Sequence, residues 1–142
     1  MNTYLSTFIS GLQKPVEQLL RENLNVLQIS LLLDGTVIYQ TNEDIKKIQH
    51  LRFLNNTFLV LEKFKNLQTK DNPFNYMLHQ VISMNLDVEL KDFLQGAKTF
   101  RIVASDENKC ISLDKKLVTE VENKICKRLN LKVDSHKPRI EF

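Results

Sequence analysis

The first half of the chain switches between the apolar spacing of strands and that of helices. Tyr4–Ser10 alternates between two faces, with Tyr4 and Phe8 on one of them, which predicts a strand. Gly11 breaks this pattern, and Pro15 suits the first turn of a helix because its missing N–H costs nothing there. The apolar stripe of this helix recurs at helical spacing: Val16, Leu19, Leu20 and Leu24.

The next segment predicts a β-hairpin. Val26–Leu33 is apolar enough to predict a central strand, and Thr36–Thr41 returns as the third strand. Between them, Asp34 and Gly35 both tolerate the positive φ that a two-residue hairpin turn requires. This pair is the strongest turn signal in the sequence.

The third strand leads into a second helix. Its alternation places Val37 and Tyr39 on the face opposite Ile38. Thr41, with Asp44 three residues later, is the expected start of the helix, because a hydroxyl and a carboxylate at this spacing can cap each other's backbone N–H groups. The buried side of this helix is expected at Ile45, Ile48 and Leu51.

With a fourth strand over Phe58–Phe64, the order of elements becomes β-α-β-β-α-β. This order is the ferredoxin-like arrangement, an antiparallel sheet with two helices on one face. We therefore expect an α+β fold in which residues 1–66 form a ferredoxin-like N-terminal domain. A polar stretch at this point predicts a link to a second domain over residues 67–142.

The second predicted domain starts with helices and ends with a strand–helix–strand pattern. Pro73 suits the first turn of one helix, and Asn85–Ala97 predicts another. Thr99–Ser105 is strand-like and precedes a long amphipathic helix, after which a last strand-like run stops at Phe142. The inward side of the long helix is expected at Leu117, Val118, Val121, Ile125 and Leu129.

Composition and charge narrow the class of protein. An apolar share of 42% and a charged share of 26% are typical of a soluble globular domain, and no apolar run is long enough to span a membrane. Cys110 and Cys126 are too few for a disulfide framework, so we expect reduced thiols and a cytoplasmic protein. The net charge is +3, but eleven Lys and Arg against six Asp and Glu lie between Lys98 and Arg139.

Patterns typical of enzymes are few in this segment. Its three glycines form no phosphate-binding or dinucleotide-binding loop. The three histidines have no metal-ligand spacing with each other or with the cysteines. The carboxylates of Asp87, Glu89 and Asp92 are expected on a helix exterior. We therefore expect no catalytic residue, no metal site and no cofactor within this segment.

The basic residues around Thr99–Ser105 and the following helix are the candidate binding residues. Lys and Arg neutralise phosphates and give affinity for nucleic acid that does not depend on sequence. A helix N-terminus adds free N–H groups. An ordinary charged surface explains the same residues equally well, so charge alone leaves both interpretations open. The candidates for RNA contact are Lys98, Arg101, Lys109, Lys115 and Lys116.

The same stretch resembles the THUMP domain of RNA-modifying enzymes. The resemblance rests on Thr99–Ser105 (TFRIVAS), the helix after it, Leu131–Asp134 (LKVD) and Pro138–Glu141 (PRIE). Where the family often has glycine at the helix end, this chain has Asn130, which can also take the left-handed conformation needed there. The resemblance implies a small ferredoxin-like domain before the THUMP domain, in agreement with the pattern of residues 1–66.

The resemblance also implies a function. THUMP domains, with their ferredoxin-like neighbour, are thought to hold the 3′ end and acceptor region of tRNA and to present a distant base to a catalytic domain. Because the family pattern continues beyond the last strand, we expect residues 67–142 to be a truncated THUMP domain, with a C-terminal catalytic domain further along the same protein. Tyr4–Gly11 and Leu32–Gln40 resemble bacterial RNA methylases of this group. This implies an S-adenosylmethionine-dependent RNA methyltransferase that binds its cofactor outside this segment.

Three other interpretations stay open. The module can belong to a tRNA thiouridine synthetase. The chain can be a ferredoxin-like protein-interaction or regulatory domain without RNA binding, whose basic end is an ordinary surface. It can also be a small enzyme on the same scaffold, which the lack of a catalytic constellation disfavours. Binding to tRNA that weakens steeply with salt would separate the RNA-binding interpretation from the protein-interaction one.

Overall fold

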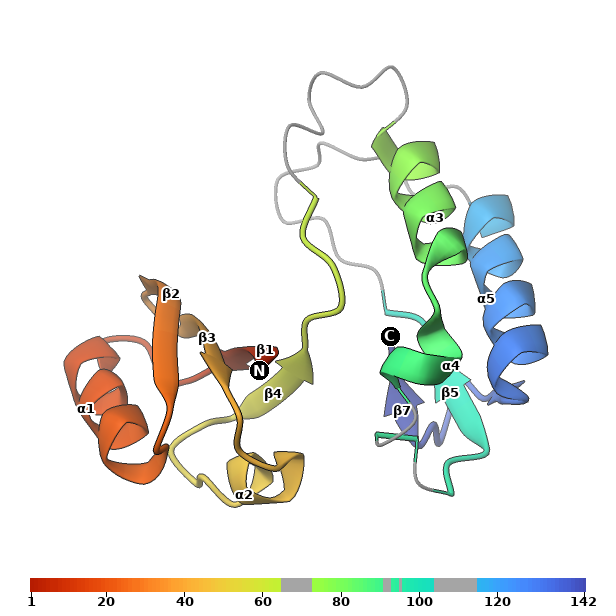
Figure 1. Ribbon diagram of the computed structural model, residues 1–142. Helices are drawn as coiled ribbons and strands as arrows, with labels where there is room; N and C mark the ends of the chain where they lie inside the picture. Colours follow the sequence, from red (N-terminus) through yellow and green to blue (C-terminus); the bar gives the residue numbers. More distant parts are fainter. Residues whose placement is uncertain (65–72, 91–92, 95, 104–114) are drawn as a thin grey trace. The chain divides into compact units, whose positions relative to one another are not determined.

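The chain divides into two compact units in a computed structural model: a first unit, Met1–Lys63, and a second unit, Phe64–Phe142 (Figure 1). The structure describes residues 1–64, 73–90, 93–94, 96–103 and 115–142. The domain boundary predicted between residues 66 and 67 lies outside the described residues.

The first unit has the β-α-β-β-α-β order predicted from the sequence, and its α+β class is confirmed. All neighbouring strands pair antiparallel, in the order β2-β3-β1-β4. The elements are β1 (Asn2–Thr7), α1 (Gln13–Asn23), β2 (Leu27–Leu33), β3 (Thr36–Thr41), α2 (Ile45–Gln49) and β4 (Asn56–Leu59).

The core of the first unit lies on one face of this sheet. β1 and β3 are its central strands, and their register places Tyr4 opposite Tyr39, both fully buried. Val37 is also buried while Ile38 is partly exposed, so the predicted alternation of β3 is confirmed. The two helices supply the other half of the core: Val16, Leu20 and Leu24 from α1 and its end, and Ile48 from α2.

The prediction that the second strand is central is wrong. β2 is an edge strand, with Leu31 and Leu33 41% and 53% exposed, and its pairing with β3 is irregular between Ile29 and Leu31. The physical reason is the connection: β3 returns from the hairpin into the place beside β1, which leaves β2 with one neighbour. Apolar composition shows that a segment is a strand but not where the strand lies in its sheet.

Boundaries in the first unit also differ from the predictions: β1 covers Asn2–Thr7 instead of Tyr4–Ser10, and two further elements differ for a physical reason. α2 begins after Asp44, whose Oδ1 accepts the N–H of Lys46 at 2.9 Å, whereas Thr41 is buried within β3. β4 ends at Leu59, which pairs with Tyr4, because β1 offers few residues beyond that point for pairing. Sequence spacing therefore located both elements but placed their ends incorrectly.

The second unit is built on a small parallel sheet. Its elements are α3 (Pro73–Ser83), α4 (Leu86–Glu89), β5 (Thr99–Arg101), α5 (Lys115–Leu129), β6 (Lys132–Val133) and β7 (Ile140–Glu141). β5 is the central strand, and β6 and β7 flank it in parallel. α3 packs along α5, as Figure 1 shows. Among the described residues of this unit, the buried apolar ones are Leu78, Leu86, Leu90, Phe100, Ile125 and Leu131.

Local details of the second unit test several predictions. The helix predicted over Asn85–Ala97 is present as the short α4, with residues 91, 92 and 95 outside the described part. β5 ends at Arg101, and the last two residues of the predicted strand, 104 and 105, also lie outside that part. Asn130 has a φ of 53° directly after α5, which confirms the left-handed helix end expected there.

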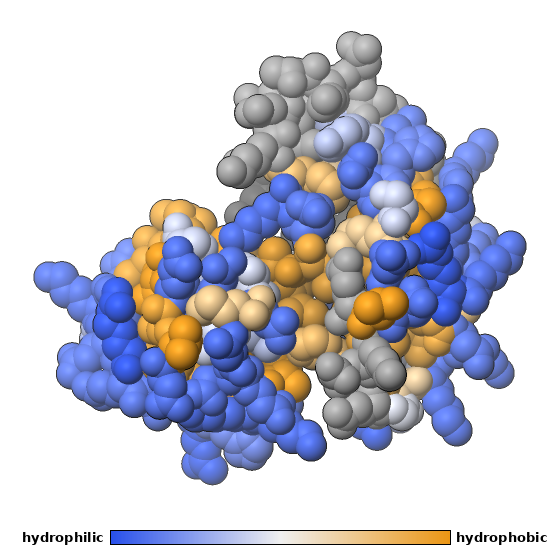
Figure 2. Space-filling view, in the orientation of Figure 1, coloured by the Kyte–Doolittle hydropathy of each residue, from blue (hydrophilic) through white to orange (hydrophobic). Residues whose placement is uncertain are grey.

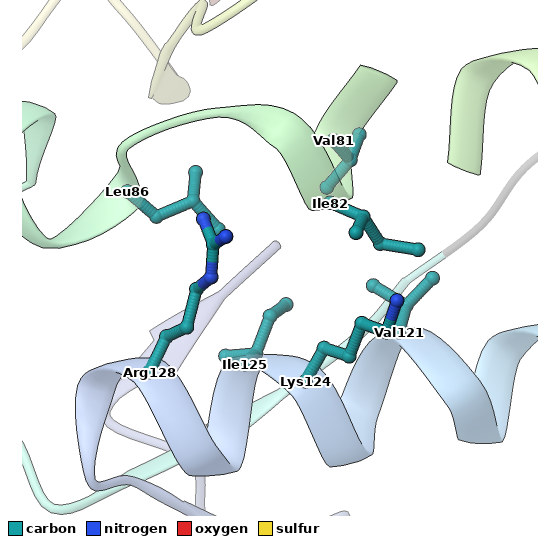
Figure 3. Close-up of a pocket in the computed structure, with 7 residues that line it drawn as sticks. All are labelled: Val81, Ile82, Leu86, Val121, Lys124, Ile125 and Arg128. Atoms are coloured by element: carbon teal, nitrogen blue, oxygen red, sulfur yellow. The ribbon is translucent and has the colours of Figure 1, made fainter. Parts of the chain in front are cut away.

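α3, α4 and α5 meet along an apolar seam. Figure 3 shows Val81 and Ile82 from α3 facing Val121 and Ile125 from α5. The cavity between them is about 10 Å³, close to the smallest space that holds one water molecule, so the seam is packing and not a ligand site. At its end, the Arg128 guanidinium donates to the Met84 carbonyl, just after the last residue of α3.

Hydrophilic side chains cover the surface formed by α5 in the view of Figure 2. No helix among the described residues is both long and apolar enough to cross a bilayer.

Candidate nucleic-acid interface

The parallel sheet places a basic residue on each side of Thr99 in β5: Lys132 of β6, and Arg139, which directly precedes β7. Lys132 lies in register with Thr99, and its N–H donates to the Lys98 carbonyl at 2.9 Å. On the other side of β5, the N–H of Arg139 is 3.2 Å from both the carbonyl and the hydroxyl oxygen of Thr99. Thr99 therefore has a basic residue on each side, Lys132 in β6 and Arg139 directly before β7. We call Lys132, Thr99 and Arg139 the basic row.

The basic row lies on the face of the sheet opposite the core. Phe100, the next residue of β5, is fully buried, and side chains alternate between the two faces of a strand. Thr99 and Arg101 therefore share the other face, and Lys132 and Arg139 are both exposed. We call this face, on which Lys132 and Arg139 are exposed and Thr99 and Arg101 half-buried, the open face. On the opposite face, Phe100 packs edge-on against Phe142, with ring centroids 5.6 Å apart.

Arg101 occupies the next position along the open face and is paired. Its Nη2 donates to Oε1 of Glu141, which lies in register with it on β7. Each side chain of this pair is 40% exposed. The Nε atom of Arg101 is buried and has no hydrogen-bond partner among the described residues. The open face thus carries two unlike rows: a basic one, and one in which a guanidinium meets a carboxylate.

The structure places three of the five candidate side chains from the sequence, Lys98, Arg101 and Lys116, and it does not bring them together at one edge of the sheet. Lys98 is exposed directly before β5, whereas Lys116 is exposed in the first turn of α5. α5 connects the parallel strands β5 and β6, so it starts at the carboxyl end of β5 and returns to the amino end. Lys98 therefore lies at the edge where α5 ends. Lys109 and the side chain of Lys115 lie outside the described residues.

Lys132 and Arg139 were missed by the sequence reasoning. Both belong to the basic C-terminal stretch, but nothing in their spacing showed that β6 and β7 flank β5 on opposite sides. A signal was present, because each precedes an apolar strand residue, Val133 or Ile140, and therefore points to the opposite face. That signal becomes useful only when the strand order is known.

Comparisons with known proteins identify the fold. No protein-family model and no curated protein matches the sequence. Solved structures do match, each over 99% of the chain. One is TrmN from Thermus thermophilus, with a TM-score of 0.70 and 14% sequence identity. Another is a 4-thiouridine synthetase in an RNA complex with bound ATP, with a TM-score of 0.58 and 18% sequence identity. PH1313 from Pyrococcus horikoshii OT3 matches over the same share of the chain, with a TM-score of 0.56 and 18% sequence identity.

These neighbours carry the THUMP region that the sequence resembles. The chain has the THUMP-type fold. It spans less than half of each matched chain: 42% of TrmN, 38% of the synthetase and 49% of PH1313. At these identities the matches establish the fold, including the ferredoxin-like unit that precedes the parallel sheet.

The turn between β6 and β7 of the THUMP-type unit depends on Asp134. Its Oδ1 accepts the N–H groups of His136 and Lys137, each at 3.0 Å. Hydrogen bonds to the ionised form favour it, so these two bonds hold the pKa of Asp134 below its ordinary value. The LKVD stretch of the sequence thus ends in a residue that shapes the turn leading to Arg139.

This turn is expected to lose stability in acid. Because the folded-state pKa of Asp134 is lowered, its contribution to folding is present above the ordinary carboxyl pKa and is lost as the pH falls through the folded-state value. Asp134→Asn should therefore lower the free energy of unfolding at pH 7, and by a smaller amount in acid. Urea unfolding at several pH values measures this difference. Asp87→Asn, which changes the charge equally at an exposed position of α4, is the control. A difference that stays constant with pH would contradict the assignment.

Other residues with reactive side chains do not form a second site in the part that the structure describes. There, no three His, Cys, Asp or Glu residues are grouped so that they could hold a metal ion. Cys126 is a half-buried free thiol within α5, and His79 is exposed on α3. The candidate interface therefore consists of basic side chains on the second unit.

Proposed function

We propose that this chain is the RNA-docking module of a larger RNA-modifying enzyme, and that its RNA is tRNA. The observation that carries the proposal is the match of 99% of the chain to the THUMP-type region of known proteins, one of which is a 4-thiouridine synthetase in complex with RNA. An open face with basic residues from adjacent strands supports the same function, because such side chains neutralise phosphates.

The enzyme that we propose for the whole protein is an S-adenosylmethionine-dependent RNA methyltransferase. The likeness of residues 4–11 and 32–40 to bacterial RNA methylases supports this choice over a thiouridine synthetase. In this proposal, a catalytic domain elsewhere in the same protein binds the cofactor, and the present chain holds the acceptor end of the tRNA. The chain itself then contributes orientation: it fixes the distance between the bound 3′ end and the base that is modified.

Binding of the chain to tRNA tests the proposed function. We expect it to bind tRNA with an intact 3′ end, and to bind tRNA trimmed of that end much more weakly. About three phosphate contacts predict a roughly 40-fold loss of affinity between ~50 and ~200 mM salt. Fluorescence anisotropy with labelled tRNA at these two salt concentrations measures both effects.

The same titrations distinguish the proposed function from the alternatives. Binding that falls steeply with salt but ignores trimming would keep RNA as the partner and remove the 3′ end as its target. Absence of salt-sensitive binding to either RNA would contradict an RNA-docking function and favour a protein-interaction domain. Duplex DNA of equal length serves as the control for charge alone, because it offers phosphates without an RNA 3′ end.

A further inference from the structure

We propose that the open face of the β6-β5-β7 sheet is the phosphate-binding surface of the module, and that Glu141 competes with RNA phosphates for Arg101. This inference rests on the proposed function and adds to it the surface, the residues and an internal competitor. Three features of the second unit support it: the basic row, the exposure of the Arg101–Glu141 pair, and the use of backbone N–H groups in the neighbouring turn.

The basic row presents two exposed cations on one face of the sheet. Lys132 belongs to β6 and Arg139 directly precedes β7, so they lie on either side of β5; neighbouring strands lie about 4.8 Å apart, which separates their Cα atoms by roughly 10 Å. Both side chains are exposed, and Thr99 between them adds a hydroxyl group on the same face. No acidic side chain belongs to this row. Phosphates are attracted by such a row without recognition of any base.

Arg101 lies on the same face as the basic row, two residues after Thr99 in β5, but its guanidinium is paired with Glu141. The pair is joined by one N–H···O contact, from Nη2 to Oε1, and both side chains are 40% exposed. Exposed ion pairs contribute little to stability, because water competes for both charges. A phosphate can accept two parallel hydrogen bonds from a guanidinium, whereas Glu141 accepts one from Arg101. RNA can therefore displace Glu141 with little loss of folding stability.

The backbone N–H groups of the turn after β6 do not form a second binding site for phosphate. The N–H groups of His136 and Lys137 both donate to Asp134, so they are not available to a phosphate. Phosphate binding at this edge therefore depends on side chains. A surface of this kind responds to substitution of individual charges, which makes the proposal testable.

Glu141→Gln is expected to strengthen tRNA binding. The substitution keeps the shape of the side chain and releases Arg101, so we expect affinity to rise about three- to tenfold at low salt. The slope of log K against log salt should become steeper by about one unit, the change expected for one additional phosphate contact. Lys132→Gln with Arg139→Gln should weaken binding at least tenfold and reduce the slope by about two units.

Glu120→Gln is the matched control. Glu120 pairs with Lys124 on α5 at 3.9 Å, and the two side chains are 52% and 43% exposed, so this pair resembles Arg101–Glu141 but lies on a helix. Its removal changes the net charge by the same amount and is expected to change affinity less than twofold. Urea unfolding of every variant verifies that the fold is retained.

The outcomes separate this inference from the proposed function. Equal gains from Glu141→Gln and Glu120→Gln would show a general charge effect and overturn the competition. Normal binding by the Lys132→Gln/Arg139→Gln variant would overturn the surface while the RNA-docking function stands. Failure of the unchanged protein to bind tRNA at all would overturn both.

Discussion

Phe100→Ala is expected to lower the free energy of unfolding of the second unit by about 3–5 kcal/mol, the range measured when buried aromatic residues are truncated. Phe100 is fully buried at the centre of the parallel sheet, and its ring packs edge-on against Phe142 at 5.6 Å. Truncation removes the apolar contacts of the ring and leaves a cavity beside Phe142. Urea unfolding followed by circular dichroism measures the effect.

Two control substitutions make this result interpretable. Phe100→Leu keeps most of the apolar volume and should cost clearly less than the alanine variant. Val88→Ala removes apolar atoms from a side chain that is 70% exposed and should change stability by less than about 0.5 kcal/mol. A Phe100→Ala variant as stable as the unchanged protein would mean that this residue does not occupy the core. Because the buried ring of Phe100 holds β5 in place, its loss should also displace Thr99 and Arg101 and so weaken RNA binding.

Tyr39→Ala is expected to be equally damaging in the first unit, with a loss of about 3–5 kcal/mol. Tyr39 is fully buried on the central strand β3, and its ring lies 5.8 Å from that of Tyr4. Its hydroxyl group lies 3.2 Å from Ser6 Oγ, which is itself 2.8 Å from Thr57 Oγ1. Burial raises the pKa of Tyr39, so the hydroxyl stays protonated at neutral pH.

Tyr39→Phe separates the ring from the hydroxyl. It removes the oxygen while Ser6 keeps its bond to Thr57, so we expect a loss of only about 1 kcal/mol. A loss as large as that of the alanine variant would show that the hydrogen-bond chain, and not the apolar ring, stabilises this core. Chemical denaturation of both variants under the same conditions decides between these two contributions.

Several parts of the fold could be predicted because local chemistry determines them. The alternation of Val37 and Tyr39 identified the buried face of β3, since successive strand residues point to opposite faces. Asp34 and Gly35 form the predicted hairpin turn, and Gly35 has a positive φ of 79°, but the positive φ expected at Asp34 is wrong. Asn130 takes the left-handed conformation at the end of α5. These features depend on neighbouring residues, which the sequence contains in full.

Other parts could not be predicted because they depend on distant residues. β2 was expected at the centre of its sheet and lies at the edge, since the position of β3 beside β1 decides the order. The ends of β4 and β5 depend on how many residues their partner strands offer for pairing. A segment's own apolar pattern contains no information about its partner.

The candidate site shows the same division. The sequence by itself determined that the C-terminal part is basic, that Thr99–Ser105 includes a strand, and that the order of elements resembles a THUMP region. Only the tertiary structure decided that Lys132 and Arg139 lie beside Thr99 and that Glu141 meets Arg101. The reason is that charge and strand periodicity are properties of a segment, whereas strand order and register arise when separate segments pair.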